Sequence, residues 1–308
     1  MAQALFAGVN AAVLTPMRDD LSVDLDRMAA HCRWLLARGC NGLGVLGTTG
    51  EANSLGIDER IAVLEGLIER GIDPACLLPG TGTPALTDTV MLSRRAAQLG
   101  CRGVLVLPPF FYKSPSDDGL FAYFSEVINR LGDGPAVYLY HFPQQSAVPF
   151  SLDLIGRVLR AFPGRLRGIK DSSGDWANTH AMITAFGADG FEVYPADDSQ
   201  FHAALHAGAA GCITAAANVG SAVSAVVYAN RNTKTGADAQ AMLTSVRRAV
   251  TSVALIPGLK ALIARHTGDP AWHTIRPPHL RLPDADAACL FAAFDATGAR
   301  LTDPAEAA

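Results

Sequence analysis

Short apolar segments of strand character alternate with helical segments over about 215 residues of this chain. The helical segments, such as Asp24–Ala37 and Asp117–Leu131, repeat apolar residues about every three to four positions. Eight strand–helix units in succession predict an α/β fold of the closed (β/α)8 type, the TIM barrel, because a doubly wound sheet usually needs fewer strands. The eight predicted strands are Gly8–Leu14, Gly42–Leu46, Cys76–Pro79, Gly103–Leu107, Ala136–Tyr140, Leu166–Lys170, Phe191–Tyr194 and Gly211–Thr214.

The strand pattern stops after Ala217, and the rest of the chain is predicted to be helical. Breaks between helices are expected at Asn232–Gly236, at Pro257–Gly258 and at the prolines after Arg276, because glycine and proline interrupt helices. The predicted helices are Ser221–Asn230, Ala237–Ile256, Leu259–His266 and Ala285–Phe294. We therefore expect a catalytic barrel over residues 1–232 and a small C-terminal helical extension over 233–308, used for packing or assembly.

Composition excludes several classes of protein. Hydrophobic residues make up 49% and charged residues 18% of the 308 residues, which is typical of a well-packed enzyme. The net charge of -4 gives no basic surface, so nucleic acid is not an expected partner. No segment reaches the roughly 18 unbroken apolar residues of a membrane span, and the residues from Met1 to Phe6 lack the basic and apolar regions of a signal peptide.

The six cysteines lie far apart, mostly in apolar segments, and form no CxxC pair. This pattern predicts reduced, buried thiols and a cytoplasmic location.

One lysine stands out at the end of a predicted strand. Lys170 ends the apolar segment from Leu166 and is followed at once by a turn. The chain has only four lysines and many more arginines, so arginine serves as its general surface cation. Arginine cannot lose its proton to become a nucleophile, whereas a partly desolvated lysine can. A solvated lysine that merely ends a strand is the alternative interpretation.

Other polar residues follow neighbouring strands at the face where barrel enzymes have their active sites. Gly47–Glu51 follows the second predicted strand, and its small residues allow backbone N–H groups to face an anion. Tyr140 ends the fifth strand, next to the strand of Lys170. An amine, a phenol and an anion-binding loop are the groups needed for imine chemistry on a 2-keto acid.

These motifs carry a resemblance to a known family. The chain resembles the dihydrodipicolinate synthase and N-acetylneuraminate lyase family over nearly its full length, with the motifs in the family's order and spacing. The matching motifs are Thr15-Pro16, Gly47–Glu51 (GTTGE), the tyrosine and proline of Tyr140–Pro143 (YHFP), Gly168–Gly174 (GIKDSSG) and Gly211–Val219 (GCITAAANV).

The resemblance implies roles for individual residues. It implies that Lys170 forms the Schiff base, that Tyr140 is the general acid/base, and that Thr48 and Thr49 bind the substrate carboxylate and relay protons. Further pocket positions match Ala196 and Ile213, the latter through its backbone. The resemblance also implies a homotetramer that needs no metal ion or organic cofactor.

Two positions depart from the synthases of the family. Where those enzymes have an arginine that grips the carboxylate of the aldehyde substrate, this chain has Gln145. The tyrosine that enters a neighbouring subunit's site corresponds to Phe111, or to Tyr112 if the alignment shifts by one residue. We therefore expect a lyase or aldolase that joins pyruvate or a related 2-keto acid to an aldehyde, or cleaves the product, such as a 2-keto-3-deoxy sugar acid aldolase or dehydratase. A true 4-hydroxy-tetrahydrodipicolinate synthase, which uses aspartate semialdehyde, is the alternative.

An NAD-dependent oxidoreductase and a non-catalytic keto-acid sensor are more remote alternatives. Gly42–Gly47 matches the GxGxxG pattern of dinucleotide-binding folds, but its glycines fall inside a predicted strand instead of opening a helix. The acidic residue that such folds need would be Glu65 or Glu69, both inside a predicted helix. The presence of both Lys170 and Tyr140 disfavours a sensor.

The remaining polar residues have simpler interpretations. His202 and His206 are spaced to bind a metal, but without a HExxH context a helix face is preferred. His141 either borders the pocket or is structural. Asp197 and Asp198 form an acid/base pair or cap the following helix. Lys260 is predicted to be a solvated residue on a helix.

Overall fold

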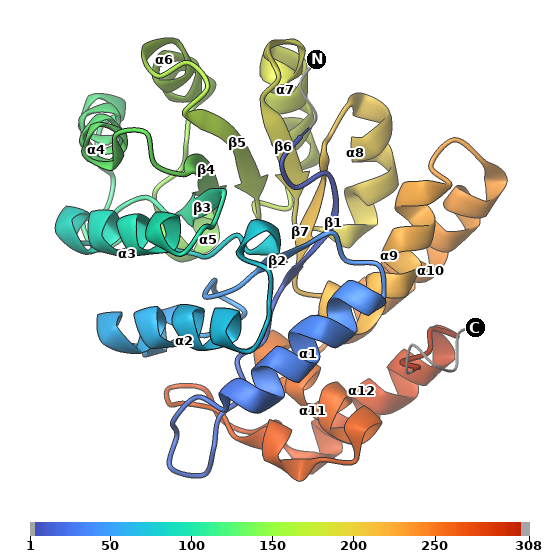
Figure 1. Ribbon diagram of the computed structural model, residues 1–308. Helices are drawn as coiled ribbons and strands as arrows, with labels where there is room; N and C mark the ends of the chain where they lie inside the picture. Colours follow the sequence, from blue (N-terminus) through green and yellow to red (C-terminus); the bar gives the residue numbers. More distant parts are fainter. Residues whose placement is uncertain (1–3, 303–308) are drawn as a thin grey trace.

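The structure, a computed structural model, describes residues 4–302 and is a (β/α)8 barrel with helices packed around its strands (Figure 1), which confirms the predicted fold class. All strand pairs are parallel, in the orders β2-β1-β7 and β3-β4-β5-β6. The strands are β1 (Gly8–Ala12), β2 (Gly42–Gly44), β3 (Gly103–Val106), β4 (Ala136–His141), β5 (Leu166–Asp171), β6 (Glu192–Pro195) and β7 (Gly211–Thr214).

The predicted strand Cys76–Pro79 is wrong as a regular strand. Pro74–Cys76 forms a 3-10 turn (η2), and the following residues join β2 to β3 through isolated bridges only. The Leu78 N–H donates to the Leu43 carbonyl at 2.9 Å, and the Leu105 N–H donates to the Pro79 carbonyl at 2.9 Å. Pro79 has no N–H to donate, so a continuous ladder cannot form at this position. This irregular segment still fills the third of the eight strand positions, between β2 and β3.

The barrel closes between β6 and β7, where the Ala210 N–H donates to the Val193 carbonyl at 3.2 Å. In the described residues, eight helices cover the outside of the barrel, and single helical turns connect some of the elements. The outer helices are α1 (Leu25–Ala37), α2 (Ile57–Glu69), α3 (Leu86–Gln98), α4 (Asp117–Leu131), α6 (Leu152–Ala161), α7 (Trp176–Phe186), α8 (Phe201–Ala207) and α9 (Ala217–Ala229). The short turns are η1 (Ala52–Ser54), α5 (Pro143–Ser146), η3 (Gly187–Asp189) and η4 (Asp198–Gln200).

Helix α4 illustrates why these segments are helical. The hydroxyl of Ser116 accepts a hydrogen bond from the Gly119 N–H at 3.2 Å and caps the first turn. The buried residues of the helix recur at helical spacing and form one apolar face: Leu120, Phe124, Val127, Ile128 and Leu131. This face packs into the main core between the strands and the outer helices.

A second set of buried side chains fills the barrel interior. Tyr138, Tyr194 and Ile213 are fully buried there. Both tyrosine hydroxyls donate to the buried carboxylate of Glu192 at 2.7 Å, and Arg167 donates to it at 2.8 Å. Glu192 lies at the start of β6, so this network fills the barrel at the N-terminal ends of the strands.

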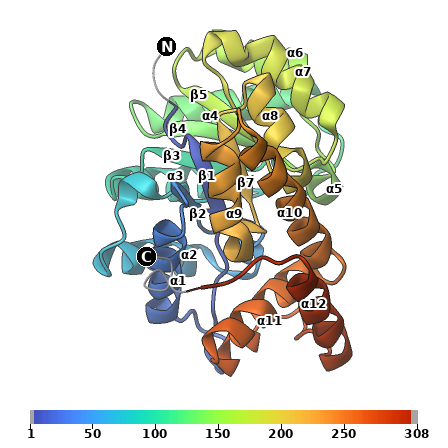
Figure 2. The same ribbon diagram turned by 90° about the vertical axis from the view of Figure 1, so that its right-hand side faces the viewer.

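The extension consists of α10 (Lys234–Thr251), α11 (Leu255–Thr267), the 3-10 turn η5 (Pro270–His273) and α12 (Asp284–Ala296). Figures 1 and 2 show α11 and α12 together at one end of the barrel. Residues of α11 and α12, such as Leu259 and Leu290, share an apolar core with Leu14 and Val219, which lie just after β1 and in α9. The predicted boundary at residue 232 falls between α9 and α10.

The predicted break at Pro257–Gly258 is wrong, because the helices separate between Thr251 and Leu255 instead. Pro257 occupies the first turn of α11, where a backbone N–H has no partner within the helix, so a proline is tolerated. The predicted break at Asn232–Gly236 also extends too far, since Gly236 lies in the first turn of α10.

The cysteines largely follow the prediction. All six thiols are free, and Cys32, Cys40, Cys101 and Cys212 are buried. Cys76 is only partly buried, and Cys289, on α12, is exposed. The prediction of buried thiols is therefore wrong for these two cysteines. Within residues 4–302, no helix is both long and apolar enough to cross a membrane.

Candidate active site

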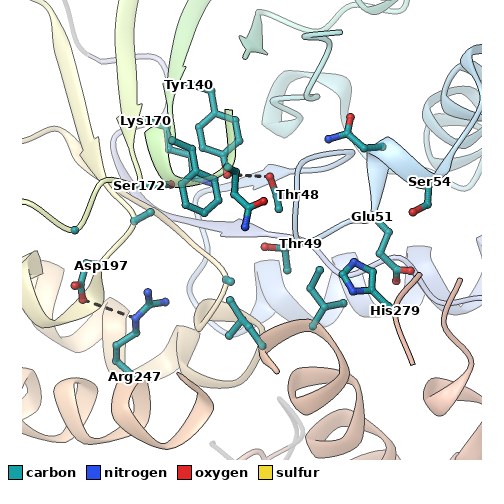
Figure 3. A pocket seen from close by; sticks show the side chains of 18 of the residues that line it. Thr48, Thr49, Glu51, Ser54, Tyr140, Lys170, Ser172, Asp197, Arg247 and His279 are labelled. Atoms are coloured by element: carbon teal, nitrogen blue, oxygen red, sulfur yellow. Dashed lines mark hydrogen bonds and ion pairs between the residues drawn. The ribbon is translucent and has the colours of Figure 1, made fainter. Parts of the chain in front are cut away.

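A cavity of about 540 Å³ opens where the strands end, and Lys170 lines it (Figure 3). Its walls come from the loops after the strands and from the extension. The lining residues are Thr48, Thr49, Glu51, Asn53, Ser54, Tyr140, Phe142, Gln145, Lys170, Ser172, Gly174, Ala196, Asp197, Ala215, Arg247, Leu255, Ile256, Pro278 and His279. This volume is within the range of small-molecule sites.

Lys170 and Tyr140 are direct neighbours across two strands. The parallel register of β4 and β5 pairs Tyr140 with Lys170, so both side chains reach the same end of the barrel. The Lys170 Nζ atom lies 4.3 Å from the centre of the Tyr140 ring. Only 4% of Lys170 and 3% of Tyr140 is exposed. The amine and the phenol therefore lie side by side, as the strand ends predicted.

The loop after β2 meets Tyr140 from the other side. The Tyr140 hydroxyl and the Thr48 hydroxyl lie 3.2 Å apart, within hydrogen-bond distance (Figure 3). The backbone N–H groups of Thr48 and Thr49 have no acceptor among residues 4–302, which leaves them able to bind an anion. The loop is anchored to the segment after β1, because the buried Thr15 hydroxyl donates to the Gly50 carbonyl at 2.8 Å.

Glu51 ends this loop in a left-handed conformation, with φ of 56°. Its carboxylate is buried and lies 2.5 Å from the Nζ atom of Lys260. The prediction that Lys260 is a solvated residue is therefore wrong: it is 1% exposed, and it also donates to the Thr274 carbonyl at 3.0 Å. Burial lowers the pKa of Lys260, while Glu51 acts in the opposite direction. A buried lysine of this kind needs an acidic partner, and the sequence alone does not reveal that partner.

A cluster of charges lies on another wall of the cavity. The Arg247 guanidinium of α10 has its Nε atom 3.7 Å from the Asp197 carboxylate and its Nη1 atom 3.9 Å from the Asp198 carboxylate. Asp197 caps η4 by accepting from the Ser199 N–H at 3.0 Å. Asp198 is fully buried and accepts from the Thr214 hydroxyl at 2.7 Å. Burial raises the pKa of Asp198 to about 6.

The other predicted site residues are distributed as follows. Ala196 and Gln145 line the cavity, whereas Ile213 is fully buried in the barrel interior and is not among the lining residues. Phe111 and Tyr112 are 70% and 75% exposed in the loop after β3, and they do not line this chain's own cavity. Their rings form an edge contact with centroids 5.4 Å apart.

The histidines have structural contacts. The His141 Nδ1 atom accepts a hydrogen bond from the Phe150 N–H at 3.2 Å, and burial lowers the pKa of this imidazole. His202 and His206 both contact the Arg231 carbonyl through Nε2, at 2.8 and 2.9 Å. No group of three or more His, Cys, Asp and Glu side chains in residues 4–302 is arranged to bind a metal ion.

Gly42–Gly47 does not open a helix, as a dinucleotide-binding loop would. Its first three residues are β2, and the next helical turn, η1, begins only at Ala52. Gly42 and Gly44 lie in the strand as predicted, whereas Gly47 lies in the bend after it.

Sequence reasoning missed the contribution of the extension. Arg247, Pro278 and His279 line the cavity although they lie far from the barrel motifs in sequence. A weak signal for Arg247 existed, because it follows directly after Val246 on a helix whose apolar residues Leu243, Val246 and Val250 face the core. A residue at the edge of a buried face is often only partly exposed.

Comparison with known proteins identifies the family of this barrel. The sequence profile of the Dihydrodipicolinate synthetase family matches residues 5–290. An uncharacterized DapA-like lyase of Chloroflexus aurantiacus is 36% identical over 291 residues, which cover 94% of this chain and 96% of that protein. The chain therefore belongs to the dihydrodipicolinate synthetase family and is a lyase of that family, as the resemblance of its motifs predicted.

Solved structures agree with this assignment. The crystal structure of dihydrodipicolinate synthase from Agrobacterium tumefaciens is 32% identical, with a TM-score of 0.85, and the match covers 94% of this chain and 99% of that one. A prophage protein of E. coli K12 from the same family, solved in complex with pyruvate, is 26% identical with a TM-score of 0.88, covering 96% of this chain and 100% of that one.

Proposed function

We propose that this protein is a Schiff-base aldolase or related lyase that acts on pyruvate, or a similar 2-keto acid, and an aldehyde. The neutral amine of Lys170 adds to the ketone carbon, and the Tyr140 phenol donates its proton to the departing hydroxyl, so that water leaves and a protonated imine forms. The Tyr140 phenolate then takes a proton from the carbon beside the protonated imine, and the resulting enamine attacks the aldehyde carbon. The new alkoxide takes a proton back from Tyr140, and water releases the product from Lys170. Cleavage is the same sequence reversed.

The single observation that carries this proposal is the buried contact between Lys170 and Tyr140 at the open end of the barrel. The Thr48 hydroxyl, 3.2 Å from the phenol, supports a proton path to the cavity. The unpaired N–H groups of Thr48 and Thr49 support a site for the keto-acid carboxylate beside it. Ala196 lines the cavity and is proposed to contact the same half of the substrate, and Ile213 is proposed to contribute a backbone contact.

The aldehyde is proposed to be uncharged, as in 2-keto-3-deoxy sugar acids. Gln145 provides only neutral hydrogen bonds where synthases have an arginine, and a charge-assisted pair is roughly twice as strong. A true synthase that uses aspartate semialdehyde is the second candidate. It is supported by the 32% identity to the Agrobacterium synthase structure and by the presence of a different arginine, Arg247, in the cavity.

Borohydride trapping tests the imine step. Reduction in the presence of pyruvate should add one pyruvate-derived group to the peptide that contains Lys170, and Lys170→Arg should abolish the adduct. Lys113→Arg is a matched control, since Lys113 is exposed and contacts carbonyl oxygens outside the cavity lining. An unmodified Lys170 peptide in the wild type would refute the proposal. An adduct without turnover of any keto acid would instead favour the sensor.

A substrate panel separates the two candidates. Condensation of pyruvate with aspartate semialdehyde is compared with cleavage of 2-keto-3-deoxy sugar acids and of N-acetylneuraminate. We expect kcat/KM for the best sugar acid to exceed that for the semialdehyde by at least about tenfold, the effect of about 1.4 kcal/mol of differential binding. The opposite order would identify a synthase.

We also propose a homotetramer located in the cytoplasm. The exposed Phe111 and Tyr112 are proposed to contact a second copy of the chain, as the matching tyrosine does in related synthases. The double substitution Phe111→Ser and Tyr112→Ser should lower the mass in solution by light scattering, and the single substitution Met91→Ser on another exposed surface should not. A wild-type monomer would contradict the proposed assembly.

A further inference from the structure

We infer that Asp197 and Arg247 together bind adjacent hydroxyl groups on the aldehyde half of the substrate. The inference rests on the proposed function and assigns the part of the cavity that selects the aldehyde. The two residues come from different parts of the chain: Asp197 follows β6, and Arg247 lies on α10 of the extension. Figure 3 shows them facing each other on the wall beyond Lys170.

The guanidinium of Arg247 has unused hydrogen-bonding capacity. Its side chain is only 25% exposed. Yet its closest carboxylate oxygens lie at 3.7 and 3.9 Å, beyond hydrogen-bond distance, and no other acceptor pairs with it in the described part of the chain. A guanidinium carries five N–H donors in a planar arrangement, and a largely buried one is normally satisfied. Its unpaired donors are therefore available to a molecule in the cavity.

Asp197 offers the complementary acceptor. One carboxylate oxygen, Oδ1, accepts from the N–H and the hydroxyl of Ser199, at 3.0 and 2.8 Å. No donor among residues 4–302 is paired with the second oxygen, Oδ2. The side chain lines the cavity, so Oδ2 can accept from a hydroxyl that enters it.

The charges on this wall favour hydroxyls over an anion. Because its pKa is about 6, Asp198 is mainly ionised at neutral pH. Asp197, Asp198 and Arg247 then carry a net charge of about -1 together, which repels a carboxylate brought close to them. A hydroxyl avoids this repulsion, since its oxygen accepts from Arg247 and its proton is donated to Asp197. Two adjacent hydroxyls can use both partners at once.

The experiment compares three aldehydes as partners for pyruvate: glyceraldehyde, with adjacent hydroxyls, propanal, which lacks both, and succinic semialdehyde, which carries a carboxylate. We expect the wild type to show a kcat/KM for glyceraldehyde about 10- to 100-fold above those for propanal and succinic semialdehyde, because the propanal complex leaves polar groups of the site unpaired.

Variants assign this preference to the two residues. Arg247→Gln, Arg247→Lys and Asp197→Asn should each reduce the glyceraldehyde-to-propanal ratio at least fivefold. Arg247→Lys keeps the positive charge beside the buried Asp198 carboxylate, so it guards against a folding defect in Arg247→Gln. Arg248→Gln, at the exposed neighbouring position on α10, is the matched control and should keep the wild-type ratio.

Three results would overturn the inference. These are a wild type that does not distinguish glyceraldehyde from propanal, a wild type that prefers succinic semialdehyde, and folded variants that retain the wild-type ratio. Borohydride trapping of pyruvate on Lys170 is measured in the same preparations. A wild type that traps pyruvate but does not prefer glyceraldehyde to propanal refutes hydroxyl recognition alone, whereas absence of the adduct in the wild type refutes the proposed function.

Discussion

The Tyr140 side chain contributes both a ring and a hydroxyl to the cavity. The ring stacks on Phe142, with centroids 5.9 Å apart, and contacts Lys170, while within residues 4–302 the hydroxyl has Thr48 as its one hydrogen-bond partner. Tyr140→Phe should therefore preserve the packing and reduce kcat by roughly 10²- to 10⁴-fold, the range for loss of a general acid/base. Steady-state kinetics together with the melting temperature check this expectation.

A matched control is Tyr123→Phe, which removes a hydroxyl that is 2.9 Å from Thr89 and lies away from the cavity. It should lower stability modestly and leave kcat unchanged. If Tyr140→Phe retains full activity, or loses activity only in proportion to unfolded protein, the hydroxyl has no part in proton transfer.

Asp198 is predicted to make the stability of the protein pH-dependent. Its folded pKa, about 6, is above the ordinary value of 3.8, so the folded state binds its proton more tightly than the unfolded state does. This contribution is fully present below about pH 4 and is lost as the pH rises through about 6. A shift of about two units corresponds to about 3 kcal/mol.

Asp198→Asn should remove this dependence while keeping an acceptor for Thr214. Denaturant unfolding at pH 4 and pH 7.5 gives the free energy of unfolding of both proteins. The difference between variant and wild type should shift in favour of the variant by on the order of 3 kcal/mol from pH 4 to pH 7.5. Asp189→Asn, at an exposed carboxylate, is the control. An equal difference at both pH values would show that the Asp198 pKa is not raised.

Among elements, the loop after β2 and helix α11 depend on each other through Glu51 and Lys260. Both side chains are buried, and removal of one partner leaves an uncompensated charge. Lys260→Met should therefore reduce the free energy of unfolding by about 3–5 kcal/mol. Because Glu51 lines the cavity, the substitution should also lower kcat/KM. Urea unfolding and kinetics measure the two effects.

The double substitution Glu51→Gln and Lys260→Met provides the control. It leaves no buried charge, so it should recover a large part of the stability lost in Lys260→Met. Equal destabilisation of the single and double variants would indicate that packing of the Lys260 chain matters more than its charge.

Elements with strong periodicity were predictable from the sequence, and elements that depend on distant partners were not. The alternation of apolar strands and amphipathic helices such as α4 was sufficient to predict the barrel. The segment Cys76–Pro79 is as apolar as a strand, but Pro79 prevents a regular ladder. Pro257 was predicted to break a helix. It is tolerated because α11 begins at Leu255 and places Pro257 in the first turn, and the sequence pattern did not reveal that starting point.

The site divides in the same way. Lys170, Tyr140 and the Thr48–Thr49 loop follow strands directly, so the barrel topology places them at one end. Arg247 and Lys260 are on helices of the extension, and their inward position depends on tertiary packing. Sequence periodicity reports which face of a helix is apolar, but it does not report which carboxylate that face meets.

For the whole molecule, we expect chemistry without a metal ion or nicotinamide. Incubation with EDTA and dialysis should leave kcat/KM within about twofold of the untreated enzyme, because the proposed groups Lys170 and Tyr140 supply both nucleophile and acid/base. Calorimetric titration with NAD should show no binding. Loss of activity that returns on adding a divalent cation, or saturable NAD binding, would revive a metal-dependent enzyme or an oxidoreductase.

The cavity is built from two sources: the reacting side chains come from the barrel, and part of the wall around them comes from the extension through Arg247, Pro278 and His279. Part of the wall that is proposed to select the aldehyde is therefore encoded downstream of the stretch that supplies the reacting side chains. Substitutions or exchanged segments after residue 233 can redirect such a catalyst toward new aldehydes while its imine-forming half stays intact. The contact between Glu51 and Lys260 sets the limit of that freedom, because a replacement segment has to supply a cation at the same buried position.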